Sequence, residues 1–157
     1  MTTRDDLMAE LWPASRRYLA SYVLFNQAVA DHLGMHPTDV QCLSLLTLED
    51  GPVTTGRIAE LTGLTSGSAT RLVDRLEKAG LVARRRDEAD RRRVLVAVLP
   101  DALEHFGRVW RTLGTDWAAV YADDSEAELA FLLHHMRRVV DLSHRQIARL
   151  ANGLEPA

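Results

Sequence analysis

The stretch that decides the fold is residues 53–99, VTTGRIAELTGLTSGSATRLVDRLEKAGLVARRRDEADRRRVLVAVL. Its apolar periodicity predicts four elements in order: a helix over 55–62, a helix over 66–79, and two strands over 81–86 and 93–99. Gly63 separates the two helices, and Gly80 ends the second one, as expected of a residue that tolerates positive φ. Helix, turn, helix and basic hairpin in this order predict a winged helix-turn-helix.

The second predicted helix has one apolar face and one small, polar face. Its apolar stripe has the i, i+3, i+4, i+7 spacing and consists of Ala69, Leu72, Val73 and Leu76. Thr65 is the expected N-cap. The other face and its flanks carry the side chains expected to approach a DNA groove: Ser66, Gly67, Ser68, Thr70, Arg71 and Arg75. Arginine can bind guanine edges or phosphates. The alternative is an amphipathic surface helix whose polar face meets only water.

Six arginines flank or lie in the turn of the predicted hairpin. Their positive charges repel one another unless an anion neutralises them. The acidic residues of the turn neutralise part of this charge. We expect Arg91 and Arg92 to contact DNA, with Arg92 in a minor groove. Asp87 and Asp90 are expected to shape this wing, with Arg91 as the partner of one of them. The alternative is a soluble edge hairpin protected by charge, for which lysine is the more usual residue.

The charge is unevenly distributed along the chain. The 157 residues have a net charge of −3, yet residues 66–93 hold nine Lys/Arg against five Asp/Glu, a local net charge of +4 that leaves −7 elsewhere. A basic patch on an acidic body directs DNA to one surface. No apolar run is long enough to span a membrane, and the N-terminus lacks a secretory signal pattern. We therefore expect a cytoplasmic protein, with the single cysteine, Cys42, as a core residue.

The run from Gly56 to Val96 resembles the DNA-binding core of the multiple-antibiotic-resistance regulator (MarR) family. The matching pieces are the turn Leu61–Leu64, TRLVDRLE at 70–77, Gly80–Val82, and the wing sequence DEADRR at 87–92. Two departures are Arg57, where the family usually has an acidic residue, and Glu88, which replaces a common wing proline. The resemblance implies a homodimer with intertwined terminal helices beneath two winged heads.

Long helices are predicted at both ends of the chain. Apolar stripes predict helices over 4–33, about 101–121 and about 126–151, the last beginning with a capping box at Ser125. A further helix, over about 39–49, is expected to use Thr38 as its cap. We therefore expect a mainly α protein, one MarR-like domain over 1–157. Its expected parts are a winged helix-turn-helix core (36–100) and a helical dimerisation region (4–34 and 101–151).

Aromatic residues of two predicted helices could line a cavity: Tyr18, Tyr22, Phe25 and Trp110. The resemblance to the MarR family implies that a small aromatic or phenolic effector binds near there. The alternative is that these side chains fill the dimer core. We find no metal-ligand cluster, no cofactor motif and no nucleophile or paired-carboxylate motif, so no metal site, cofactor or enzymatic activity is expected.

The favoured function is a ligand-responsive repressor that binds double-stranded DNA at a near-palindromic operator as a homodimer. One alternative is a winged-helix protein-interaction module that does not bind DNA. Another is the dimerisation domain of a small-molecule methyltransferase, which would need a nucleotide-binding domain after it. Charge reversal in the wing separates the first two, because only a DNA-binding protein should lose its function.

Overall fold

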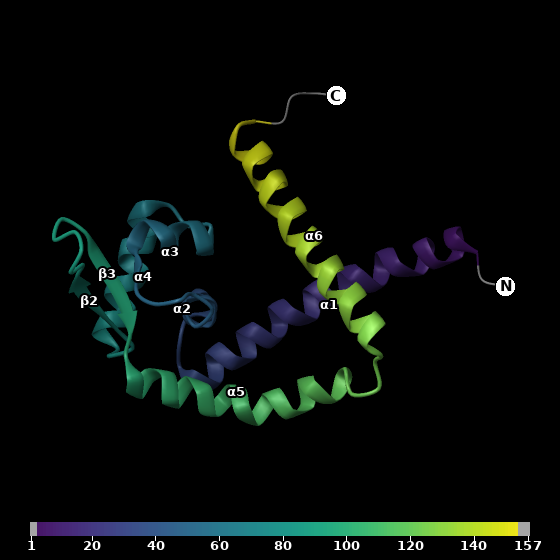
Figure 1. The fold of residues 1–157 in the computed structure, drawn as a ribbon, viewed down its shortest axis with the longest axis horizontal. Helices are drawn as coiled ribbons and strands as arrows, with labels where there is room; N and C mark the ends of the chain where they lie inside the picture. The colour runs from purple at the N-terminus through teal and green to yellow at the C-terminus, as the bar shows by residue number, and fades with distance from the viewer. Residues whose placement is uncertain (1–2, 154–157) are drawn as a thin grey trace. The chain divides into compact units, whose positions relative to one another are not determined.

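The computed structural model describes residues 3–153, apart from the side chains of His105 and Thr115. Its elements are α1 (Arg4–Leu33), α2 (Pro37–Leu46), β1 (Val53–Thr54), α3 (Thr55–Thr62), α4 (Ser66–Lys78), β2 (Val82–Arg86), β3 (Val94–Val98), α5 (Pro100–Val120) and α6 (Glu126–Ala151) (Figure 1). This confirms the expected mainly helical winged helix-turn-helix. The chain divides into two compact units, Met1–Phe106 and Gly107–Ala157, and α5 passes from the first into the second.

The three strands form one antiparallel sheet in the order β1-β3-β2. Val53 pairs with Val96 on one side of β3, and Val82 pairs with Val98 on the other. The inner face of this sheet and the short helices α2, α3 and α4 share one apolar core. Its most deeply buried side chains include Val40, Leu43, Ile58, Leu72, Val73, Leu76, Val82 and Val96. The whole predicted stripe of α4 is buried, which fixes the face that this helix turns outward.

Local signals set both ends of α4. Thr65 is its N-cap, and the Thr65 hydroxyl oxygen accepts a hydrogen bond from the backbone N–H of Ser68 at 3.3 Å. Gly80 follows the helix with φ of +70°, in the left-handed region that costs glycine little. The N–H of Leu81 then bonds to the carbonyl of Leu76, which turns the chain into β2. Both predicted boundary residues are confirmed.

The predicted start of α2 was wrong. The cap is His36, whose Nδ1 accepts a hydrogen bond from the backbone N–H of Thr38 at 3.3 Å, so Thr38 lies inside the helix. Pro37 occupies the first helical position, where its fixed φ suits the helix and its missing N–H leaves no donor unsatisfied. The helix also ends earlier than expected, at Leu46.

Cys42 lies in the core contributed by α2 and is about 1% exposed. Burial, and to a smaller extent the charge of Asp39, raises the pKa of its thiol to about 12. The thiol is therefore protonated at neutral pH, as expected of a packing residue rather than a reactive one.

The two long terminal helices are apolar but poorly buried. In α1 only Val29 and Ala30 are buried, and in α6 no described residue is. Trp12 of α1 is 70% exposed and Phe131 of α6 is 68% exposed. The predicted capping box of α6 is confirmed, since Ser125 and Glu128 exchange hydrogen bonds across its first turn. Across residues 3–153, no helix combines the length and the apolar character needed to cross a membrane.

Candidate nucleic-acid interface

The outward face of α4 is the first part of the candidate site. Ser66, Gly67, Thr70 and Arg71 are exposed, and Ser68 is half-buried beside the cap. The Thr70 hydroxyl donates to the carbonyl of Ser66 at 2.9 Å, which leaves its oxygen lone pairs free to accept. A Cβ placed on Gly67 would meet no atom within 4 Å, so the first turn presents an open backbone surface. Within the described part of the chain, the Arg71 guanidinium has no hydrogen-bond or ion-pair partner.

The turn between β2 and β3 is organised by two carboxylates. Asp87 accepts a hydrogen bond from the N–H of Ala89 at 2.9 Å, and Asp90 accepts one from the N–H of Arg92 at 3.0 Å. Backbone bonds join Asp87 to Arg93 and Arg93 to Asp90 across the same turn. Each aspartate thus holds its own local turn, a role that this residue performs well because its short side chain reaches the backbone two positions on.

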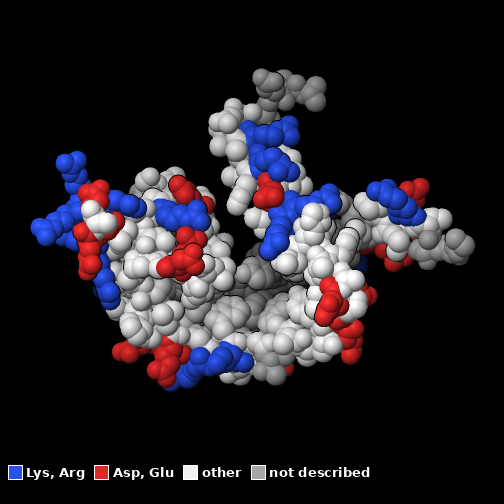
Figure 2. Space-filling model, viewed as in Figure 1, with Lys and Arg blue, Asp and Glu red and all other residues white. Residues whose placement is uncertain are grey.

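The wing arginines fall into two groups. Arg84 and Arg93 are in ion pairs, the latter with Asp87 at 3.7 Å. The partner of Asp87 is therefore Arg93 rather than the expected Arg91. Among residues 3–153, the other four wing guanidinium groups have no side-chain partner: those of Arg85, Arg86, Arg91 and Arg92. Figure 2 shows basic side chains, all of them arginines in this segment, gathered at the tip of the hairpin with acidic groups between them.

The positive charge of Arg84 is neutralised by carboxylates of α4. The sequence had suggested the acidic residues of the wing turn for this role. Its guanidinium pairs with Glu77 through Nη1 and with Asp74 through Nη2, the second contact at 2.6 Å. The backbone N–H of Arg84 also donates to the Glu77 carboxylate at 3.0 Å. That backbone bond, followed by the guanidinium bond, holds the pKa of Glu77 below its usual value of 4.5. One carboxylate therefore joins the recognition helix to the first wing strand.

Arg75 is also engaged within the protein. Its Nη2 lies 2.6 Å from Oδ1 of Asp39 and its Nε lies 3.3 Å from Oδ2, a two-point contact between α4 and α2. Arg75 was expected to face DNA, and the importance of Asp39 was not anticipated. The sequence did offer a signal for Asp39, because this acidic residue lies in the first turn of a helix that is otherwise mostly apolar. A carboxylate buried in such a helix needs a cationic partner.

The residues expected to line an effector pocket lie in both units. Tyr18, Tyr22 and Phe25 follow one another along α1, with both tyrosines exposed and Phe25 half-buried. Trp110 is half-buried and belongs to the second unit. The effector pocket stays a prediction.

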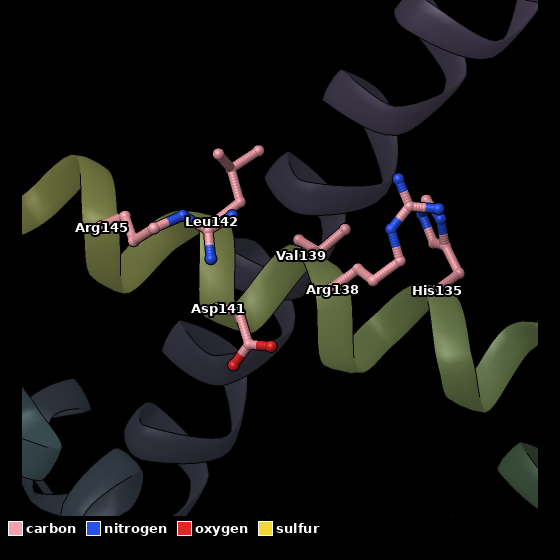
Figure 3. Close-up of a pocket in the computed structure, with 6 residues that line it drawn as sticks. All are labelled: His135, Arg138, Val139, Asp141, Leu142 and Arg145. Carbon is pink, nitrogen blue, oxygen red and sulfur yellow. The ribbon is translucent and has the colours of Figure 1, made fainter.

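A second surface feature, which the sequence did not suggest, is a groove along α6. It is lined by His135, Arg138, Val139, Asp141, Leu142 and Arg145. Figure 3 shows Val139 and Leu142 on one side of the helix and Asp141 projecting from the other. The groove therefore combines apolar and charged side chains on a helix that has no buried residue of its own among those described.

The fold and this basic surface define the protein as a winged helix-turn-helix DNA-binding transcriptional regulator. The model of the MarR family matches residues 33–93. The chain is 40% identical over 128 residues to the HTH-type transcriptional regulator YcgE of Bacillus subtilis (strain 168), with 82% of each chain covered. It is also 34% identical over 97 residues to the HTH-type transcriptional regulator YfiV of the same organism, with 62% of this chain and 60% of YfiV covered. The chain belongs to the MarR family, whose members are regulators rather than enzymes.

Solved structures show the same fold. A MarR family protein from Bacillus stearothermophilus matches with a TM-score of 0.69 and 26% identity, over 90% of this chain and 99% of that one. The transcriptional regulator BldR from Sulfolobus solfataricus matches with a TM-score of 0.63 and 22% identity, over 88% of this chain and 98% of that one. These matches extend well beyond residues 33–93, so the likeness in fold includes elements of the long terminal helices.

Proposed function

We propose that the protein is a cytoplasmic repressor that binds a near-palindromic operator as a homodimer and releases it in response to an effector. The observation that carries the DNA-binding part is the combination of an exposed Arg71 on α4 with four wing arginines that have no side-chain partner among residues 3–153. Both belong to the same compact unit, within a chain whose remaining residues are acidic overall. Such a surface attracts phosphates.

The proposed contacts divide between two grooves. The first turns of α4 enter a major groove, where small side chains allow close approach and Arg71 binds a guanine edge. The wing places Arg92 in a neighbouring minor groove and Arg91 on the phosphates. The proposed DNA-contacting set is Ser66, Gly67, Ser68, Thr70, Arg71, Arg91 and Arg92. Asp87 and Asp90 support the wing by holding its turn.

Homodimer formation is supported by the apolar surfaces of α1 and α6. Large apolar side chains are exposed along both helices, far more than a monomer usually leaves in water. On α1 they include Leu7, Leu11, Trp12, Leu19 and Val23, and on α6 they include Leu129, Leu133, Met136, Val139, Val140 and Ile147. A second copy would bury both surfaces by two-fold symmetry, and two recognition helices would then read half-sites about one helical turn apart.

The experiment begins with selection of a binding sequence from a randomised duplex library by the full-length protein. Fluorescence anisotropy over a salt series then compares the selected duplex with a scrambled one. We expect Arg71→Ala to weaken binding to the selected duplex by about 1–3 kcal/mol and to relax selectivity. Arg91→Ala should reduce the salt slope by about 0.9 for each phosphate that the variant no longer neutralises. Arg149→Ala, on α6, is the control and should change neither quantity.

Two outcomes would contradict the proposal. If no sequence is enriched and all duplexes bind equally weakly, operator recognition is wrong. If a selected duplex binds tightly but Arg71→Ala and Arg91→Ala behave like Arg149→Ala, the DNA-contacting surface lies elsewhere.

The proposed effector is a small aromatic or phenolic molecule. Bound near Tyr18, Tyr22 and Phe25 of α1, it would alter the spacing of the two winged heads. Titration of a panel of phenols and aromatic carboxylic acids into the DNA complex tests this. Release of the selected duplex by one of them, with the effect abolished by Tyr22→Ala, is expected. Unchanged DNA affinity across the panel would contradict an effector of this class.

A further inference from the structure

Ion pairs hold the recognition helix at both edges of its exposed face. Successive residues of an α-helix are about 100° apart around its axis, so Arg75 and Glu77 are separated by about 160°. Arg75 faces α2 and Glu77 faces β2. Between these edges lies the outward face that carries Gly67 and Arg71.

The edge facing α2 is held through a buried carboxylate. The side chain of Asp39 is only 9% exposed, and its two oxygens accept from Nη2 and Nε of Arg75 at 2.6 and 3.3 Å. A two-point contact of this kind fixes the direction of the guanidinium plane as well as its distance. Arg75 therefore resists both sliding and rotation of α4 on α2.

The edge facing the wing is held through Arg84. Its side chain is 29% exposed and pairs with both Asp74 and Glu77, which are about one helical turn apart on α4. Because Glu77 also accepts from the Arg84 backbone N–H, the contact fixes the strand itself and not only a flexible side chain. Arg84 further neutralises two carboxylates that would otherwise repel a phosphate beside the DNA-facing surface.

We propose that Arg75 and Arg84 are positioning residues that clamp α4 between α2 and β2, so that their guanidinium groups serve this clamp instead of contacting DNA. The clamp fixes the spacing between Arg71 on the helix and Arg92 on the wing. That spacing decides whether a major-groove contact and a minor-groove contact form together on one sequence. The inference that this spacing sets DNA sequence selectivity rests on the proposed function, whereas the existence of the clamp does not.

The test uses double variants that remove each ion pair and conserve net charge. They are Asp39→Asn with Arg75→Gln, and Glu77→Gln with Arg84→Gln. The matched control is Glu49→Gln with Arg57→Gln, which removes a two-point ion pair of the same kind away from α4. Hydrogen exchange by mass spectrometry is measured on the free full-length proteins. Salt slopes and selectivity are measured on the selected and scrambled duplexes.

We expect Asp39→Asn with Arg75→Gln to speed amide exchange in α2 and α4, and Glu77→Gln with Arg84→Gln to speed it in α4 and β2. Each variant should exchange at least about tenfold faster than wild type, because these segments open more often without the ion pairs. The selectivity ratio should fall about tenfold or more, while the salt slope stays the same because the variants keep every phosphate contact. The control should change none of the three quantities. If a double variant does not fold, Arg75→Lys or Arg84→Lys takes its place, since lysine keeps the charge but cannot reproduce the two-point contact.

Each readout can overturn the inference separately. Unchanged exchange in α4 and in the segment paired with it would show that the ion pairs do not position these segments. A selectivity ratio that stays at the wild-type value would show that the clamp does not set the spacing between Arg71 and Arg92. A salt slope reduced by about 0.9 for each arginine removed would show that Arg75 or Arg84 contacts phosphate. Absence of a preferred duplex for the wild-type protein would contradict the proposed function, while hydrogen exchange would still decide whether the clamp exists.

Discussion

The guanidinium group of Arg75 and the carboxylate of Asp39 face each other at 2.6 Å, although 36 positions separate these residues in the sequence. The pair is asymmetric, because Arg75 keeps half of its side chain in solvent while Asp39 has almost none there. The two partners therefore depend on the contact to different degrees.

Arg75→Met is expected to destabilise the protein more than Asp39→Asn. The first variant leaves a buried carboxylate without its charged partner, at a cost of about 1–3 kcal/mol in the free energy of unfolding. The second leaves a guanidinium that water can still reach, at a cost of about 1 kcal/mol or less. Urea denaturation at a fixed protein concentration measures both, with Arg71→Met as a same-helix control. Equal losses for the two variants would contradict the asymmetry.

The carboxylate of Glu77 should titrate below its ordinary pKa of 4.5, because the folded state favours its charged form through Arg84. A lowered folded-state pKa stabilises the protein above the unfolded-state pKa, and this stabilisation is lost as the pH falls through the folded-state value. Carboxyl ¹³C NMR titration should therefore show a Glu77 pKa that rises toward 4.5 in Arg84→Met. An unchanged Glu77 pKa in that variant would show that the Arg84 guanidinium is not a cause.

Cys42 should be nearly inert toward alkylation in the folded protein. Burial raises the pKa of its thiol to about 12, so only a minute fraction is thiolate at a pH of about 8. We expect reaction with iodoacetamide at that pH to be slower than in the urea-unfolded protein by at least about tenfold. Mass spectrometry over time measures both rates. Comparable rates would show that the thiol is accessible, as a redox role of Cys42 would require.

The apolar surface of α1 should govern self-association. Leu19 lies on this surface and is 59% exposed, whereas Ser21 is about 160° away around the helix. Leu19→Asp should raise the dimer dissociation constant by at least about tenfold, since it places a charge in an apolar interface. Ser21→Asp adds the same charge on the other face and should leave dimerisation intact. Sedimentation equilibrium distinguishes the two, and a monomeric wild type would contradict the proposed dimer.

Local sequence signals were enough to predict the elements of the winged core and most of their limits. The stripe on α4 encodes its buried face, Thr65 and Gly80 encode its ends, and Ser125 encodes the start of α6. These signals succeed because each involves residues within one or two helical turns, where the chain has few alternatives. The start of α2 was missed even at this range, because His36 and Pro37 compete with Thr38 for the same cap and together satisfy the backbone better.

How the basic residues are used depends instead on packing between elements that are distant in the sequence. The composition of residues 66–93 indicated an arginine-rich surface for DNA but made all its arginines appear alike. Arg75 and Arg84 form ion pairs with carboxylates of α2 and α4, while Arg71, Arg91 and Arg92 have no such partner in the described chain. The reason is physical: a long arginine side chain can reach many partners. Which carboxylate lies within about 3 Å of it depends on how separate helices and strands pack together.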